Sequence, residues 1–179
     1  MKAKQILTGL VSLAVATAVV GGVRFGLSGL RSSITQAEQQ EMIRFMLPES
    51  TTFTPEEYTG EDETIAAVYK GETGYVVETV TNGYAGEIRM LVGVDNGGTV
   101  TGVTVRSMEE TWGLGAQALT DTDFLIQFLF TQGDAEVGEN VDALTGATVT
   151  SKAIARSVNA AVGFVTGADT TSSATSWGG

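Results

Sequence analysis

The sequence predicts an α+β protein with an N-terminal transmembrane helix followed by one antiparallel-sheet domain covered by helices. Three observations support this fold class. Residues 6–23 carry no charge and are mostly Leu, Val, Ala and Gly. Four later segments are rich in Val, Ile, Tyr and Thr and are separated by glycine-containing turns. A final segment has apolar residues at helical spacing.

The apolar N-terminal segment is long enough to cross a bilayer. Two lysines precede it, and Arg24 and Arg31 follow it. A helix rises about 1.5 Å per residue, so roughly 20 residues cross the hydrocarbon layer, and residues 6–30 suffice when Arg24 reaches the interface. A cleaved signal peptide is the alternative, because the two lysines resemble its basic start. We favour a retained anchor, since the apolar run is long and no small-residue cleavage site ends it before Arg24.

The composition excludes several kinds of redox and catalytic site. The chain has 179 residues and contains no cysteine and no histidine. Disulfides, thiolate-bound iron–sulfur clusters, haem held by His or Cys and almost every zinc site are therefore excluded. Nucleophilic catalysis by Ser-His-Asp or Cys-His groups is excluded for the same reason. We predict no catalytic residue and no metal ligand, and any electron carrier must be an organic cofactor.

The region after the anchor begins with a helix and an acidic linker. Thr35 and Glu38 have the spacing of a capping box, and Pro48 stops a helix predicted over 35–47. Residues 49–63 are polar and acidic and contain a proline and a glycine. This composition favours a linker that runs over the surface.

Four segments predict the strands of a single antiparallel sheet. The turn between the last two contains Asn96-Gly97, which is a strong hairpin signal. In the last segment Val and Gly alternate with Thr and Arg, which fits a sheet with one face in water and the other covered by helices. The segments are 64–70, 74–80, 86–94 and 99–107.

A short helix is predicted over 124–130, after the sheet. Residues 120–123 are all Thr or Asp, which favour helix starts. We assign the phenylalanines of this helix to the core, because Phe is most often buried. They are Phe124, Phe128 and Phe130.

The stretch 142–151, Asp-Ala-Leu-Thr-Gly-Ala-Thr-Val-Thr-Ser, combines a glycine turn with clustered hydroxyls and leads into an amphipathic helix. Thr150 and Ser151 are suitable N-cap residues, so the positive end of the helix dipole should face the turn 145–148. Such a corner suits an anion, most naturally a phosphate. A well-capped helix without a ligand is the simpler alternative. The apolar helix positions are Ala153, Ile154, Val158, Ala161, Val162 and Val165.

This stretch resembles the flavinylation motif of the FMN-binding domain family, Asp-x-x-[Ser/Thr]-Gly-Ala-[Ser/Thr], at every specified position. A chance match has a probability on the order of one in a thousand. The resemblance implies that Thr148 receives FMN through a phosphodiester bond to its hydroxyl, made by a dedicated flavin transferase. It also implies that four further residues are recognition and turn positions: Asp142, Thr145, Gly146 and Ala147.

Two more segments resemble the same family. Residues 83–88, Gly-Tyr-Ala-Gly-Glu-Ile, are similar to its Gly-Tyr-x-Gly-x-Ile strand, and residues 110–115 to its Glu-Thr-Pro-Gly-Leu-Gly loop. Glycines let the loop backbone approach a flat ligand, and its Glu-Thr pair can bond to polar ring edges; an ordinary glycine loop is the alternative. Trp112 replaces the proline and is a candidate to stack on the isoalloxazine, and Ser107-Met108 stands where many members carry His. The candidate contacts are Glu110, Thr111, Trp112, Gly113, Leu114 and Gly115.

The charge distribution favours a covalently held cofactor. All 21 acidic residues follow Arg31, while four of the ten basic residues lie at or before it. An acidic domain repels the phosphate of free FMN, and a covalent bond makes retention independent of affinity. The helix N-terminus can hold the remaining charge of the phosphodiester without a Lys or Arg clamp. The same charge argues against nucleic-acid binding.

The anchor, the short length and the single motif are most similar to the G-type chain of Rnf-type ion-translocating ferredoxin:NAD oxidoreductases. This resemblance implies an FMN-bearing electron relay in a complex that couples electron transfer to Na+ or H+ translocation, with other membrane subunits as partners. It also implies a single-pass, N-in anchor in the cell inner (plasma) membrane and an extracytoplasmic C-terminal domain. Five glycines would let the anchor pack closely against a partner helix, although glycine is common in membrane helices. They are Gly9, Gly21, Gly22, Gly26 and Gly29.

Three other functions fit the same sequence. They are a C-type subunit of a Na+-translocating NADH:quinone oxidoreductase, a stand-alone extracytoplasmic flavoprotein electron carrier, and a non-redox anchored scaffold domain in which Thr148 is unmodified. The predicted organisation of the chain has four parts. It comprises 1–31 as cytoplasmic tip and transmembrane anchor, 32–63 as helix and acidic linker, 64–168 as the FMN-binding domain, and 169–179 as a flexible tail.

Overall fold

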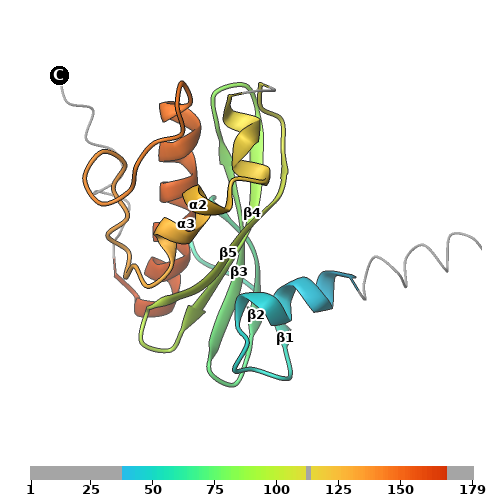
Figure 1. The fold of residues 1–179 in the computed structure, drawn as a ribbon. Helices are drawn as coiled ribbons and strands as arrows, with labels where there is room; N and C mark the ends of the chain where they lie inside the picture. Colours follow the sequence, from blue (N-terminus) through green and yellow to red (C-terminus); the bar gives the residue numbers. More distant parts are fainter. Residues whose placement is uncertain (1–37, 112–113, 169–179) are drawn as a thin grey trace, which may run out of the picture. The chain divides into compact units, whose positions relative to one another are not determined.

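The computed structural model describes residues 38–111 and 114–168. The chain divides into two compact units, Met1–Glu41 and Met42–Gly179. In the first unit, residues 38–41 are described and are helical. The second unit contains the sheet and the helices that cover it (Figure 1).

Both ends of the chain lie outside the described residues. The predicted anchor over 6–30, the capping residue Thr35 and the predicted tail over 169–179 belong to these ends, so they stay predictions. In the part of the chain that the structure describes, no helix is long and apolar enough to cross a membrane. Residues 42–46 are helical, and this helix ends just before Pro48, as predicted.

The sheet is an antiparallel meander with strand order β1-β2-β3-β4-β5 (Figure 1). Its last four strands confirm the four predicted segments to within two residues. The first strand is an addition to the prediction, because it lies within the exposed linker predicted over 49–63 and pairs with Lys70, Tyr69 and Val68 of the next strand. The strands are β1 Thr54–Glu56, β2 Ile65–Lys70, β3 Gly74–Asn82, β4 Glu87–Asp95 and β5 Val100–Met108.

The predicted hairpin turn between β4 and β5 is present and is held by one carboxylate. Asp95 Oδ1 accepts hydrogen bonds from the backbone N–H groups of Gly97 and Thr99, both at 2.8 Å. Gly98 has a φ of 84°, a conformation that glycine adopts without steric cost. The local sequence therefore fixes the pairing of β4 with β5.

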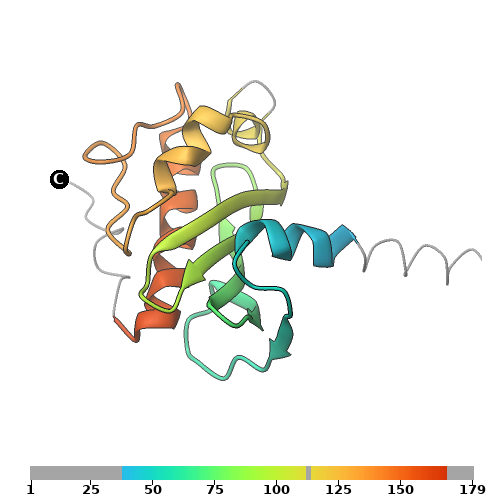
Figure 2. The ribbon, with the colours of Figure 1, turned by 60° about the horizontal axis from the view of Figure 1, so that its bottom comes forward.

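Helix α3, Thr148–Thr166, covers one face of the sheet (Figure 2). Ile154, Val158 and Val162 of α3 belong to one core cluster with the inward side chains of β3, β4 and β5. Burying each such aliphatic side chain contributes about 1.5–3 kcal/mol, so this interface fixes the position of α3. The N-terminal end of α3 consequently lies at a defined place above one end of the sheet.

The opposite face of the sheet is not simply in water, which corrects the prediction of one wet face. Ile43 and Leu47 pack there against Val76 and Leu91, and Figure 2 shows this helix and α3 on opposite sides of the sheet. A Cβ on Gly93 would collide with the carbonyl oxygen of the last helical residue. Because Gly93 has no side chain, the helix can approach the strands closely.

The polar part of that face carries an ion-pair network. Glu78 is 9% exposed, and its Oε2 lies 3.2 Å from Arg106 Nη1. Its Oε1 lies 3.9 Å from Arg89 Nη1, and Arg89 also bonds to Glu87 at 2.7 Å. Only this part of the face has the polar side chains that the predicted alternation of apolar and polar residues implies.

The segment after the sheet forms three short helices: η1 Gly115–Leu119, α2 Thr122–Leu125 and η2 Ile126–Phe128. Asp121 caps α2 by accepting from the Phe124 N–H at 2.9 Å, so the predicted helix starts earlier and ends earlier than 124–130. Phe124 and Phe128 are buried, as predicted, with their rings edge to face at 5.3 Å.

Phe130 is not a core residue, contrary to prediction, because it is 79% exposed. Its N–H donates to the Val100 carbonyl at 2.9 Å, and the Val100 N–H donates to the Thr131 carbonyl at 3.0 Å. This pairing with the start of β5 requires a φ of 67° at Phe130. The backbone of Phe130, rather than its ring, therefore joins this segment to the sheet.

One exposed carboxylate holds the segment before β1 in place. Glu72 accepts hydrogen bonds from the hydroxyls and backbone N–H groups of Thr51 and Thr52, at 2.8–3.3 Å. These bonds, led by that of the Thr52 hydroxyl, lower the pKa of Glu72 from 4.5 to about 2, since they favour the charged form.

Candidate functional site

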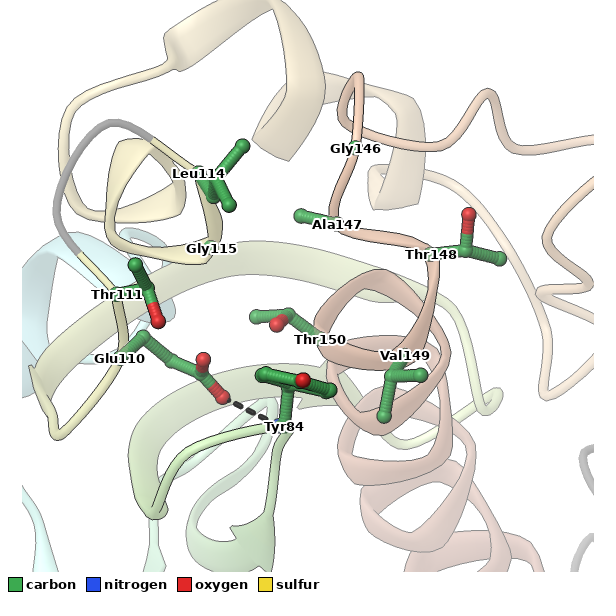
Figure 3. Close-up of a pocket in the computed structure, with 10 residues that line it drawn as sticks. All are labelled: Tyr84, Glu110, Thr111, Leu114, Gly115, Gly146, Ala147, Thr148, Val149 and Thr150. Carbon is green, nitrogen blue, oxygen red and sulfur yellow. Dashed lines mark hydrogen bonds between the residues drawn. The ribbon is translucent and has the colours of Figure 1, made fainter.

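A cavity of about 410 Å³ opens where the N-terminus of α3, the loop after β5 and the turn between β3 and β4 meet (Figure 3). Each of these three segments carries one of the predicted motifs. Most of the side chains around it are apolar or bear hydroxyls. The lining residues are Tyr84, Glu110, Thr111, Leu114, Gly115, Gly146, Ala147, Thr148, Val149 and Thr150.

The loop before α3 is anchored by alternate buried and exposed residues. Leu144 and Ala147 are buried, whereas Thr145, Gly146 and Thr148 are exposed. Gly146 has a φ of 75°, which a side chain would strain. The motif therefore presents its polar residues at the surface while its apolar residues hold the loop.

The buried Ser151 hydroxyl ties this loop to the helix. It accepts a hydrogen bond from the Leu144 N–H at 3.0 Å and donates one to the Ala147 carbonyl at 3.0 Å. Ser151 is 0% exposed, so neither bond competes with water. The position of Thr148, between Ala147 and Ser151, is therefore well determined.

The helix begins three or four residues earlier than an N-cap at Thr150 or Ser151 implies, which makes the assignment of these two residues as caps wrong. Its first residue is Thr148, and its N-cap Ala147 offers no side-chain hydrogen bond. Ser151 is instead committed to the loop, and Thr150 lines the cavity. The first N–H groups of an α-helix have no partner within it, so the helix start beside Thr148 suits a negatively charged group.

Glu110 holds the turn between β3 and β4 against the cavity. Its Oε1 accepts from the backbone N–H groups of Tyr84 at 2.6 Å and Ala85 at 3.3 Å (Figure 3). A Cβ on Gly83 would overlap the same oxygen, so glycine at this position leaves room for the carboxylate. The carboxylate thereby fixes Tyr84, which lines the cavity and is 75% exposed.

Thr150 contributes a buried hydroxyl that has no hydrogen-bond partner. The residue is 1% exposed, and its Oγ1 is unpaired. Thr150 stands opposite Gly115, where a Cβ would come within 2.6 Å of that oxygen. Buried polar atoms are usually paired, so an unpaired one in the wall of a cavity points to a ligand.

The cavity lining is poor in charge. Glu110 is the one charged residue among the described residues that line it, and no Lys or Arg is among them. An anion at this site would therefore depend on the backbone N–H groups of α3 rather than on a cationic side chain.

The structure brings together most of the predicted site residues. Seven of them line the cavity: Glu110, Thr111, Leu114, Gly115, Gly146, Ala147 and Thr148. Thr145 and Asp142 do not, and the Asp142 N–H instead donates to Gln127 Oε1 at 2.8 Å. Trp112 and Gly113 lie outside the described residues. The assigned roles of all these residues stay predictions.

Three lining residues are absent from the predicted set: Tyr84, Val149 and Thr150. Tyr84 belongs to a segment that resembles the family, but sequence reasoning assigns that segment only to a strand. Val149 and Thr150 follow the motif directly in the sequence. This proximity to the motif could have predicted Thr150 as a lining residue, but Thr150 was assigned as a helix cap instead.

The comparisons with known proteins identify the family. Residues 83–163 match the FMN-binding domain family. The chain is 33% identical over 177 residues to the G-type chain of the ion-translocating oxidoreductase complex of Methanosarcina acetivorans, covering 90% of this chain and 93% of that protein. It is 35% identical over 136 residues to the G-type chain of the proton-translocating ferredoxin:NAD(+) oxidoreductase complex of Clostridium ljungdahlii, covering 72% of each.

A third relative is the G-type chain of the Na(+)-translocating ferredoxin:NAD(+) oxidoreductase complex of Acetobacterium woodii. It is 36% identical over 114 residues, which cover 56% of this chain and 55% of that protein. The alignment thus spans about half of the Acetobacterium protein. These matches confirm the predicted resemblance. The chain belongs to the family of G-type chains of ion-translocating oxidoreductase complexes and contains an FMN-binding domain.

Proposed function

We propose that the chain carries FMN covalently on Thr148 and relays electrons one at a time between redox centres of a membrane-bound ferredoxin:NAD oxidoreductase complex. The complex couples this electron transfer to the translocation of Na+ or H+. The observation that carries the proposal is the position of Thr148, exposed at the first residue of α3 and on the wall of the 410 Å³ cavity.

The residues present fit FMN. Cofactor pockets are typically roughly 300–1,000 Å³ and mostly apolar with a few polar groups, and the cavity has this size and character. Tyr84, Leu114 and Val149 supply the apolar surface for a flat ring system, and they are 75%, 43% and 46% exposed. The unpaired Thr150 hydroxyl supplies a polar group that lacks a partner within the protein.

The attachment of FMN agrees with the charge of the site. Attachment forms a bond from the Thr148 hydroxyl oxygen to the flavin phosphorus, releases the hydroxyl proton and requires an activated flavin nucleotide that supplies the leaving group. The product carries one negative charge beside uncapped N–H groups at the start of α3, an arrangement that is favourable without a cationic side chain. A flavin transferase is the expected partner for this step.

The flavin supplies the ability to exchange single electrons, and the protein supplies its position and its polar surroundings. The cavity is open at the surface, as the exposure of its apolar residues indicates. An exposed ring edge allows a partner redox centre to come close. The chain itself contains no cysteine or histidine, so the flavin is its expected redox group.

Residues 6–30 are the proposed membrane anchor, with the N-terminus in the cytoplasm and the flavin domain on the outer side of the plasma membrane. The relatives are subunits of multi-subunit complexes, as their names state. We therefore expect other membrane subunits as partners of this chain.

The experiment compares complexes that contain the wild-type chain, Thr148→Ser or Thr148→Val, each purified through a partner subunit. Serine keeps the hydroxyl for attachment, whereas valine keeps the shape of threonine without it. We expect all three chains to co-purify with the complex. We expect electron transfer from ferredoxin to NAD+ to be lost only with Thr148→Val.

Two results would contradict this proposal. Unchanged electron transfer in the complex that contains Thr148→Val would favour the scaffold function. Absence of the wild-type chain from the complex purified through the partner subunit, although the chain is flavinylated in the same cells, would favour a stand-alone electron carrier.

A further inference from the structure

Two buried hydroxyls lack hydrogen-bond partners, and they differ in location. Thr150 Oγ1 and Thr79 Oγ1 are both unpaired, in residues that are 1% and 0% exposed. Thr150 lines the cavity, whereas Thr79 belongs to β3 and is not among the lining residues. An unpaired buried hydroxyl is costly. A bound ligand could pair with the Thr150 hydroxyl but not with the Thr79 hydroxyl, so Thr79 serves as a control for the effect of an unpaired hydroxyl alone.

The unpaired Thr150 hydroxyl faces a carboxylate across a glycine. A Cβ on Gly115 would lie 2.6 Å from Thr150 Oγ1 and 3.0 Å from Glu110 Oε2. Both oxygens therefore border the same small space, in which a side chain would clash and which Gly115 leaves without one. Figure 3 shows Glu110 and Thr150 reaching into this space from the loop after β5 and from the start of α3.

The two oxygens have complementary hydrogen-bonding capacity. A threonine hydroxyl can donate one hydrogen bond, and an ionised carboxylate only accepts. Glu110 Oε1 is the closer acceptor for the backbone of Tyr84, at 2.6 Å, while Oε2 accepts only a longer bond from Ala85, at 3.3 Å. Oε2 can accept a further hydrogen bond, because a carboxylate oxygen has two lone pairs.

We infer that the Thr150 hydroxyl and the Glu110 carboxylate, on either side of Gly115, bind the pyrimidine edge of the isoalloxazine. This inference rests on the proposed function. The Thr150 hydroxyl donates to a ring carbonyl, and Glu110 Oε2 accepts from the adjacent ring N–H. The edge of a pyrimidine-type ring presents N–H and C=O groups side by side, which matches one acceptor and one donor.

This contact gives Thr150 an effect on the redox properties of the flavin. Negative charge accumulates on the pyrimidine part of the ring on reduction, and a hydroxyl that donates to its carbonyl stabilises that charge. Loss of the hydroxyl should therefore lower the midpoint potential. The attachment at Thr148 does not depend on this bond, because the Thr148 side chain points away from Glu110 and Thr150 (Figure 3).

The first test uses the full chain made with its flavin transferase, as wild type, Thr150→Val, Thr150→Ser and Thr79→Val. Intact mass establishes FMN occupancy, and the visible circular dichroism and the midpoint potential are then measured. We expect Thr150→Val to change the dichroism and lower the potential at full occupancy. Thr150→Ser, which keeps the hydroxyl, and Thr79→Val, which removes an unpaired hydroxyl elsewhere, should match wild type.

The second test separates cofactor binding from a structural role. Each chain is also made without flavin transferase, and the melting temperatures of the flavin-free and flavinylated forms are compared. Thr150→Val and Thr79→Val should not lower the melting temperature of the flavin-free form, since neither hydroxyl has a partner to lose. The gain in melting temperature on flavinylation should shrink only with Thr150→Val.

A third measurement covers the case in which Thr150→Val is not flavinylated. Riboflavin has the same ring but no phosphate, and its binding to flavin-free chains is followed by quenching of its fluorescence. We expect Thr150→Val to weaken binding roughly fivefold, as the loss of one neutral hydrogen bond implies, and Thr79→Val to leave it unchanged.

Two outcomes would overturn the inference. In the first, flavinylated Thr150→Val has the same visible circular dichroism, the same midpoint potential and the same gain in melting temperature on flavinylation as wild type. Where Thr150→Val is not flavinylated, the corresponding result is a riboflavin affinity equal to that of wild type. The other is a lower melting temperature of the flavin-free Thr150→Val chain, which would show that the hydroxyl supports the fold. Failure of the proposed function gives a different result, namely the absence of FMN on the wild-type chain.

Discussion

Replacing Asn159 with alanine should destabilise the domain, because this side chain joins α3 to the segment that precedes the Thr148 motif. Asn159 Oδ1 accepts from the Ala135 N–H at 3.1 Å, and Nδ2 donates to the Ala135 carbonyl at 3.0 Å. Both residues are 1% exposed. Asn159→Ala therefore leaves a buried N–H and a buried C=O without these partners.

The size of the effect follows from those two groups. A buried polar group that loses its partner costs about 1–3 kcal/mol. The two groups belong to one residue and their costs are not fully additive, so we expect Asn159→Ala to lower the free energy of unfolding by about 2–4 kcal/mol. Asn140 offers a matched control in the same segment. It accepts from the Glu136 N–H at 2.7 Å and donates to the Asp134 carbonyl at 2.8 Å, but it is exposed.

The assay is thermal unfolding of the full chain, followed by far-ultraviolet circular dichroism. We expect Asn159→Ala to lower the melting temperature by roughly 5–15 °C. Asn140→Ala should lower it by roughly 4 °C or less, because water replaces its hydrogen bonds. Equal shifts for the two variants would refute the reasoning that burial, rather than the number of hydrogen bonds, determines the loss.

Three further predictions concern other parts of the domain. Gly93→Ala should cost about 1–3 kcal/mol, measured by thermal unfolding, because its Cβ collides with the carbonyl of Met46 and displaces the helix; an unchanged stability would show that the helix can shift freely. Ser151→Ala should slow flavinylation and lower the melting temperature, since it removes the acceptor for the Leu144 N–H, and a wild-type rate of flavin incorporation would contradict this. The pKa of Glu72, lowered from 4.5 to about 2, means that its contribution to stability is present above pH 4.5 and is lost as the pH falls through 2; a carbon-13 titration with a midpoint near 4.5 would disprove it.

The long strands could be predicted because their signals are local. Each is an alternating or β-branched run that ends at a glycine-containing turn, and the Asp95 carboxylate fixes one turn through residues two and four positions away. Strand β1 had no such signal. It is short and contains Pro55, and it forms because the segment lies beside β2, which is a tertiary effect.

The covered second face and the exposure of Phe130 also depend on distant contacts. Gly93 was expected only to lie in a strand, yet it admits a helix from an earlier part of the chain. Phe130 is a hydrophobic residue in a helix-like pattern, but its backbone pairs with Val100, thirty positions before it. Composition and periodicity do not contain such information.

The candidate site was predictable where its residues belong to a motif and hidden where they meet through the fold. The motif around Thr148 was visible as a contiguous string. The place of Tyr84 in the cavity depends on Glu110, which is 26 positions away. Thr150 and Ser151 were both good caps by residue type, but Ser151 bonds to the loop and Thr150 faces the cavity, so the helix starts before them.

Intact mass of the full chain, made with its flavin transferase, tests the central claim most directly. Wild type and Thr148→Ser should each gain the mass of one FMN less one water, located by peptide mapping to the segment that contains residue 148, and Thr148→Val should gain nothing. A wild-type chain of unmodified mass, with the transferase active on another substrate, or a Thr148→Val chain that still carries FMN, would contradict the account.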